Sequence, residues 1–118
     1  MAITQITLDN SNRRLHSDTI ASGGTKSGGL DIGSSVPTSI KMPAEITGTA
    51  VSFEKSYDGN DWGALLDPNT GANYSVPVAA GKWTPVKPQY FIGTRYIKMV
   101  SNGTEAAART VYLETIAY

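Results

Sequence analysis

Apolar and polar residues alternate along short stretches of this chain and do not recur with a helical period. Three pairs of apolar residues, each two positions apart, illustrate the pattern: Val51 and Phe53, Ile97 and Met99, and Val111 and Leu113. In a β-strand, residues two positions apart lie on the same face of the sheet. The pattern therefore predicts strands with one face in a core and the other in water, which is typical of antiparallel sheets.

Turn-forming residues separate these stretches. The sequence contains twelve glycines and six prolines, and pairs such as Asp58-Gly59 favour hairpin turns. Nine strands are predicted, at residues 3–8, 18–22, 29–32, 38–42, 49–57, 73–77, 82–86, 95–100 and 110–116. This number of short strands predicts an all-β fold, an antiparallel β-sandwich that resembles a jelly roll.

The length of 118 residues favours a single domain. Residues 1–17 differ from the rest, because a polar stretch at residues 9–14 separates one apolar strand from the remaining chain. We therefore expect an N-terminal arm at residues 1–17 and a β-sandwich domain at residues 18–118. The arm can become ordered on a partner, or the strand at residues 3–8 can pair within its own sandwich; the sequence favours neither.

Composition and charge argue against several classes of protein. The chain has no cysteine, and ten basic residues balance ten acidic ones, so no net charge draws it to nucleic acid or to an anionic membrane. The N-terminal residues lack the pattern of a signal peptide, and no apolar run approaches the ~20 residues that span a bilayer. We expect a soluble protein that is made in the cytoplasm.

The sequence offers no recognisable catalytic or metal site. His16 is the one histidine, and Asp58 and Asp61 flank a turn without the spacing of a calcium loop. We therefore expect no enzymatic activity and no cofactor, and a solvated loop around His16. Trp62 and Trp83 are possible ligand-binding or interface aromatics, although we expect them to close the ends of the sandwich.

Four segments, taken in order, resemble a family of small virion proteins of tailed phages: residues 40–53 (IKMPAEITGTAVSF), 56–62 (SYDGNDW), 91–101 (FIGTRYIKMVS) and 108–113 (ARTVYL). The family is that of the capsid decoration, or cement, proteins, which are jelly-roll-like sandwiches bound as trimers to the outside of the head. Residues 20–23 (IASG) and 30–33 (LDIG) resemble the first hairpin of the same pattern, so the resemblance covers roughly residues 18–116. It implies a homotrimer that binds the major capsid protein on the outer capsid surface and stabilises the head, after synthesis in the host cytoplasm.

The resemblance does not include residues 1–17, and we place the expected capsid contacts there. A strand containing Ile3, Ile6 and Leu8 can add to the open sheet edge of a neighbour through main-chain hydrogen bonds. Arg13 and Arg14 can pair with acidic loops of the capsid. These five residues are the predicted partner-binding site.

Two other functions remain open. Residues 56–62 and 95–98 also resemble discoidin-type carbohydrate-binding sandwiches, which predicts a sugar-binding module. A structural protein of the phage tail or baseplate would have the same sequence features as a capsid protein, and only its position in the particle would distinguish it.

Overall fold

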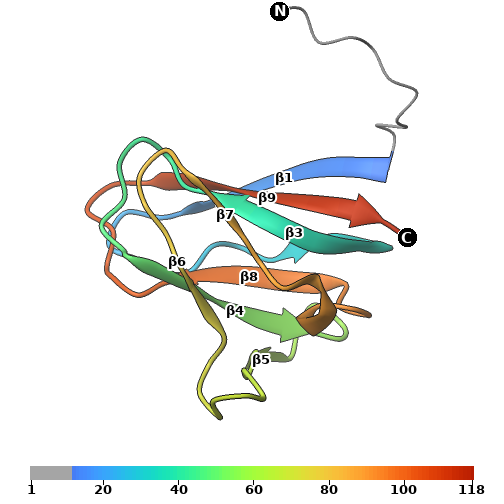
Figure 1. Ribbon diagram of the computed structural model, residues 1–118. Coiled ribbons are helices and arrows are strands. Elements are labelled where there is room, and N and C mark those ends of the chain that lie inside the picture. The colour runs from blue at the N-terminus through green and yellow to red at the C-terminus, as the bar shows by residue number, and fades with distance from the viewer. Residues whose placement is uncertain (1–11) are drawn as a thin grey trace, which may run out of the picture.

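The computed structural model describes residues 12–118, and its fold is almost entirely β-structure (Figure 1). The described residues form nine strands and one short 3₁₀ helix, η2 (Pro88–Tyr90). The strands are β1 (Arg13–Ile20), β2 (Leu30–Asp31), β3 (Ser35–Lys41), β4 (Ala50–Ser56), β5 (Trp62–Ala64), β6 (Ser75–Pro77), β7 (Trp83–Pro85), β8 (Tyr96–Ser101) and β9 (Arg109–Ala117). All of these strands pair in the antiparallel direction.

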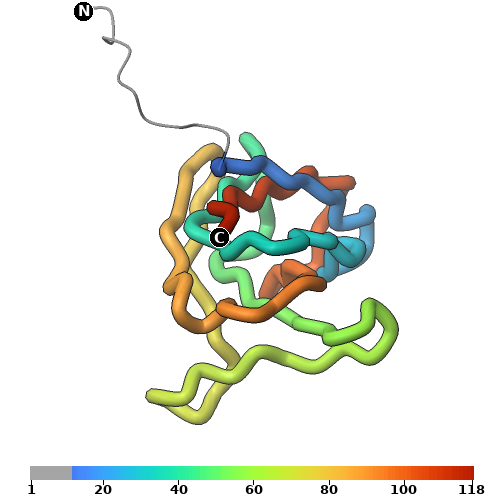
Figure 2. The backbone as a smooth tube through the Cα atoms, turned by 90° about the vertical axis from the view of Figure 1, so that its right-hand side faces the viewer, coloured from blue at the N-terminus to red at the C-terminus, as the bar shows by residue number. Residues whose placement is uncertain are grey.

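The strands form two sheets that stack face to face (Figure 2). The first sheet has the strand order β1-β9-β3-β7, and the second has the order β2-β8-β4-β5, with β6 also paired to β4. Strands that follow each other in the chain often lie in different sheets, so many connections cross from one layer to the other. The predicted antiparallel β-sandwich is confirmed.

The core lies between the two sheets and contains the predicted apolar faces. All six residues of the three alternating pairs are at most 1% exposed. The ring of Phe53 lies edge to face with that of Phe91, with centroids 5.1 Å apart, and is stacked on Tyr74 at 5.9 Å. Aromatic pairs in these arrangements add ~0.5–1.5 kcal/mol each to the effect of burial. Packing of alternate residues, without disulfides, therefore holds the sheets together.

Strand β1 extends the sandwich past the boundary that the sequence predicted between residues 17 and 18. Its register pairs Arg13 with Ile116, so residues 13–17, which were assigned to the arm, belong to the first sheet. The strand predicted at residues 18–22 includes only the last three residues of β1, because only Ile20 of its eight residues is fully buried. Backbone pairing with β9 forms the strand. The strand predicted at residues 3–8 lies outside the described residues.

His16 was expected in a solvated loop, but it lies in β1 and is half-buried. Its Nε2 atom is 3.1 Å from Oγ1 of Thr115. Burial and the charge of Arg14 lower the pKa of His16, against a smaller opposing effect of Asp31. The side chain is therefore held neutral at pH 7, as a polar contact within the first sheet.

Strand β5 has no counterpart in the sequence prediction. It is three residues long, lies at the edge of the second sheet and pairs Trp62 with Ser56 of β4. The turn at Asp58-Gly59 was predicted, and it returns the chain alongside β4; the short strand follows from that turn. A strand of this length has too few residues to show an alternating pattern.

Three connections between the sheets meet at one end of the sandwich: residues 21–29, 42–49 and 102–108. Backbone hydrogen bonds join the first and the last of these connections. The amide of Gly23 donates to the carbonyl oxygen of Glu105 at 2.7 Å, and the amide of Glu105 donates to that of Gly24 at 2.9 Å. The side chain of Glu105 then binds the remaining connection.

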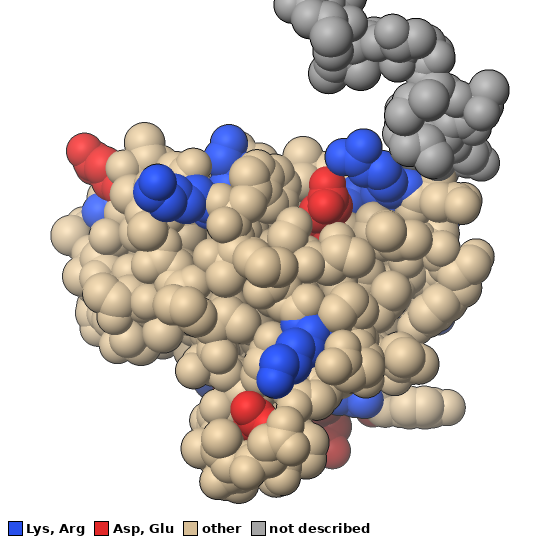
Figure 3. Space-filling view, viewed as in Figure 1, with Lys and Arg blue, Asp and Glu red and all other residues tan. Residues whose placement is uncertain are grey.

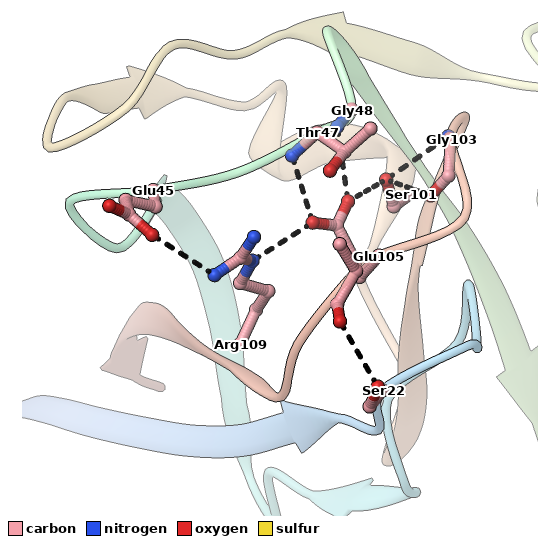
Figure 4. Close-up of polar contacts among 9 residues, drawn as sticks. Ser22, Glu45, Thr47, Gly48, Ser101, Gly103, Glu105 and Arg109 are labelled. Carbon is pink, nitrogen blue, oxygen red and sulfur yellow. Dashed lines mark hydrogen bonds and ion pairs between the residues drawn. The ribbon is translucent and has the colours of Figure 1, made fainter.

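The carboxylate of Glu105 is fully buried and accepts four hydrogen bonds (Figure 4). Oε1 accepts from the backbone amide of Thr47 at 2.8 Å and from Nε of Arg109 at 3.1 Å. Oε2 accepts from the backbone amide of Gly48 and from Oγ of Ser101, both at 3.0 Å. Burial acts to raise the pKa of the Glu105 carboxyl, but the hydrogen bonds outweigh it and hold the pKa below its usual value. The buried charge is therefore part of the fold, and Glu105 links all three connections, one through its carboxylate and another through its backbone.

Candidate docking surface

The outer face of the first sheet carries large apolar side chains exposed to water. Residues such as Ile20 and Leu113 point into the core, so the residues that alternate with them point outwards. Three outward side chains are strongly exposed: Leu15 by 63%, Trp83 by 47% and Ile116 by 44%. Apolar side chains grouped in this way on one face are typical of an interaction site.

A depression of about 450 Å³ lies on this face. It is lined by Arg13, Arg14, Leu15, Trp83 and Glu114, and we call these five residues the docking surface. They come from β1, β7 and β9, which are far apart in the sequence but neighbours in the first sheet. Arg13 forms an exposed ion pair with Glu114 at 3.2 Å, whereas Arg14 has no ion pair with any described residue. Arg14 contributes to the lining, but it alternates with Arg13 and Leu15 along β1, so its guanidinium extends from the opposite side of the strand, close to Gly33.

The charge around the docking surface is positive although the chain as a whole is neutral. Arg13 and Lys41 outnumber Glu114 on this face, and the ammonium of Lys41 lies 5.8 Å from the ring centre of Trp83. Figure 3 shows several Lys and Arg side chains along the upper side of the molecule, over the first sheet, with some Asp or Glu side chains among them. Such a surface is complementary to a partner that presents acidic and apolar side chains together.

One side of β1 is open to a further strand. Within the described residues β1 pairs only with β9, and its other edge carries eight residues without a partner strand. The opposite edge of this sheet is β7, which has three residues, one of them Pro85. A long edge strand presents unpaired backbone groups that can bind another extended segment.

The structure brings together some of the residues that the sequence predicted as sites. Arg13 and Arg14 share one depression with Trp83. Ile3, Ile6 and Leu8 lie outside the described residues. Instead of closing the ends of the sandwich, the two tryptophans lie on outer faces, because the strand registers pair them with outward positions: Trp83 with Lys41 on the first sheet and Trp62 with Ser56 on the second.

Sequence reasoning missed two members of the docking surface. Leu15 stands between polar residues in a stretch that reads as a loop, and its position shows only once β1 is paired with β9. The period-two pattern of β9 puts Glu114 on the outer face, because it alternates with Leu113 and Thr115. The sequence did not show that β1 lies beside it, so Glu114 was not recognised as part of a site.

Other kinds of site find no support in the described part of the chain. Residues 12–118 contain no group of three or more His, Cys, Asp or Glu side chains placed to hold a metal ion. In the same range, no helix has the length and apolar character needed to cross a membrane.

The fold places the protein in the class of antiparallel β-sandwiches, and comparison with known proteins adds one relationship. No protein-family profile matches the sequence, and no curated protein matches it. Among solved structures, the chain is similar to the SPBc2 prophage-derived protein YomS, with a TM-score of 0.55 and 12% identity over 98% of this chain and 100% of the other. A second match is the Yersinia pseudotuberculosis-derived mitogen YPM, with a TM-score of 0.46 and 13% identity over 91% of this chain and 86% of that one. The similarity to YomS shows a shared fold.

Proposed function

We propose that this protein is a structural protein of a tailed phage particle and that it decorates the outer surface of the capsid as a homotrimer. The observation that carries the proposal is the docking surface, where Arg13, Arg14 and Trp83 meet although they are distant in sequence. Arg and Trp are among the residues that most often dominate binding energy at protein interfaces. The proposed partner is an acidic loop of the major capsid protein.

Two further observations support a phage origin. The fold is shared, over nearly the whole of both chains, with a protein described as prophage-derived. The four segments that resemble decoration proteins lie in the sandwich itself, at residues 40–53, 56–62, 91–101 and 108–113. The fold and the sequence thus favour the same class of protein.

A trimer is the assembly that makes a small docking surface effective. Five residues are fewer than the ~20–30 residues on each side of a stable protein interface. A trimer centred on a local three-fold axis of the capsid contacts three capsid subunits at once, and such multivalent binding strengthens weak contacts by ~10²–10⁴. The contribution of Ile3, Ile6 and Leu8 remains a prediction, tested by deleting residues 1–11.

The test uses phage heads that lack the protein. The purified chain is first measured by light scattering, and a trimer is expected. It is then mixed with the heads, which are sedimented and heated. We expect saturable binding and heads that resist a higher temperature. Arg13→Glu and Trp83→Ala should each weaken binding, because one reverses a charge on the docking surface and the other removes the largest apolar contact.

The matched control is Lys87→Glu, a charge reversal at an exposed side chain that lies over the ring of Tyr90, away from the docking surface. It should bind heads as the unaltered protein does. A monomer that does not sediment with heads would refute the proposal. Binding to purified tails in place of heads would support the alternative, a tail or baseplate protein.

A further inference from the structure

We propose that the protein has a second binding site, for a neutral saccharide, at the hairpin that joins β4 to β5. A depression of about 340 Å³ lies there, and its lining includes Lys55, Tyr57, Asp58, Arg95 and Tyr96. This volume is within the range of small-molecule sites. The proposal goes beyond the proposed capsid role and does not depend on it.

The hairpin is held in one conformation by its own hydrogen bonds. Oδ1 of Asp58 accepts from the amides of Asn60 at 2.8 Å and Asp61 at 3.0 Å, and from Oγ of Ser56 at 3.1 Å. Ser56 Oγ in turn accepts from the amide of Gly59 at 2.8 Å, and Gly59 has a φ of 84° that a side chain would oppose. A site that is already ordered binds its ligand with little loss of conformational entropy.

Aromatic rings form one wall of the site. Tyr57 directly follows β4 at the start of the turn and is 95% exposed. Tyr96 is half-buried with its ring close to Gly59, and the guanidinium of Arg95 lies 5.1 Å from its ring centre. A tyrosine ring combines an apolar face with a hydroxyl group, which suits the apolar face of a sugar ring and its surrounding hydroxyls.

The charges of the site cancel, which favours a neutral ligand. Arg95 donates two hydrogen bonds to Asp31, at 3.1 and 3.2 Å, so its charge is already neutralised. The remaining charges are the ammonium of Lys55 and the carboxylate of Asp58. Among the described residues, Lys55 has no ion pair and Oδ2 of Asp58 accepts no hydrogen bond. A free donor and a free acceptor match sugar hydroxyls, which both donate and accept.

The sheet around the site can accommodate a longer saccharide chain. Ser56 pairs with Trp62 on one side and with Tyr96 on the other, so both aromatic side chains lie on the outer face of the second sheet. The ammonium of Lys98 lies 4.5 Å from the ring centre of Trp62. A polysaccharide seated at Tyr57 and Tyr96 can therefore extend towards Trp62. The docking surface is on the other sheet, and both sites can be occupied together.

The test is electrophoresis of the full chain in native gels that contain galactan, mannan or amylose, with polygalacturonate as the acidic polymer. We expect at least one neutral polymer to retard the protein and polygalacturonate to have no greater effect. Tyr57→Ala should weaken that retardation by about tenfold or more, because it removes the exposed ring. The variant should fold normally, since the side chain is almost fully exposed.

Trp83→Ala is the matched control, because it removes an exposed aromatic side chain from the other sheet and should leave retardation unchanged. Trp83→Ala should weaken head binding, whereas Tyr57→Ala should leave head binding unchanged. Failure of the saccharide site can therefore be distinguished from failure of the proposed capsid role. Absence of retardation by all three neutral polymers, equal retardation of Tyr57→Ala, or retardation by polygalacturonate alone would each overturn the saccharide site.

Discussion

Replacing Glu105 by glutamine should destabilise the protein strongly, although the two side chains have nearly the same shape. The glutamine oxygen can take the place of Oε1 and still accept from Thr47 and Arg109. The amide nitrogen then takes the place of Oε2, where Ser101 can reverse its hydroxyl and accept a hydrogen bond. The backbone amide of Gly48 has no such freedom, and it is left facing another donor.

The expected loss is about 3 kcal/mol. A buried amide without an acceptor costs about 1–3 kcal/mol, and the hydrogen bond from Arg109 loses the strengthening that an ionised acceptor provides. For a domain of this size, such a change lowers the melting temperature by about 10 °C or more. Urea unfolding of the two purified proteins measures the free energy of unfolding. The slope of this free energy against urea concentration should be the same for Glu105→Gln and for the unaltered protein.

The effect of Glu105→Gln should also depend on pH. The folded-state pKa of Glu105 lies below its usual value, so the carboxylate contributes stability above the unfolded pKa, and this contribution is lost as the pH falls through the folded pKa. The unfolded pKa of a glutamate is about 4.3. The difference between the two proteins should therefore be largest near neutral pH and shrink below about pH 4.

Glu45→Gln provides the control. Its carboxylate also contacts Arg109, at 3.5 Å, but the side chain is 83% exposed. An exposed ion pair contributes at most about 1 kcal/mol, so this substitution should change the urea midpoint little. If Glu105→Gln cost no more than Glu45→Gln at neutral pH, the reasoning about the buried carboxylate would be refuted.

Three further predictions follow from the packing. Phe53→Ala should cost about 3–5 kcal/mol in urea unfolding, because it opens a cavity in the aromatic core; a loss below half of that would contradict the packing. Gly29→Ala should cost about 1–3 kcal/mol and alter tryptophan fluorescence, since the new Cβ would lie 2.9 Å from Cζ2 of Trp62; an unchanged spectrum would count against this contact. Arg13→Ala should change stability by less than about 1 kcal/mol, because its ion pair is exposed, so any loss of head binding would reflect the interface.

The alternating pattern was a reliable guide wherever one face of a strand is buried. Val51 and Phe53 alternate with polar residues, and both lie in the core. The pattern missed residues 13–17 of β1 and all of β5, which are edge strands that bury few side chains and form through backbone pairing with a neighbour. Such pairing depends on residues far away in the sequence, so a local pattern carries little information about it.

The candidate sites depend on the same long-range information. Arg13, Arg14 and Trp83 could be selected from the sequence as charged or aromatic side chains, but their shared depression could not. Glu105 and Arg109 have a spacing of four residues in the sequence. Nothing near them in the sequence indicates that Thr47 supplies a hydrogen bond to the same carboxylate.

Strand β9 determines when the first sheet can form during synthesis. It lies between β1 and β3, and its pairing joins residue 13 to residue 116. A ribosome adds about 5–20 residues per second, so β1 remains without this partner for about 5–20 s after it is made. Contacts so distant in sequence also slow the folding of the finished chain. Its exposed edge makes the nascent protein vulnerable to aggregation in that interval.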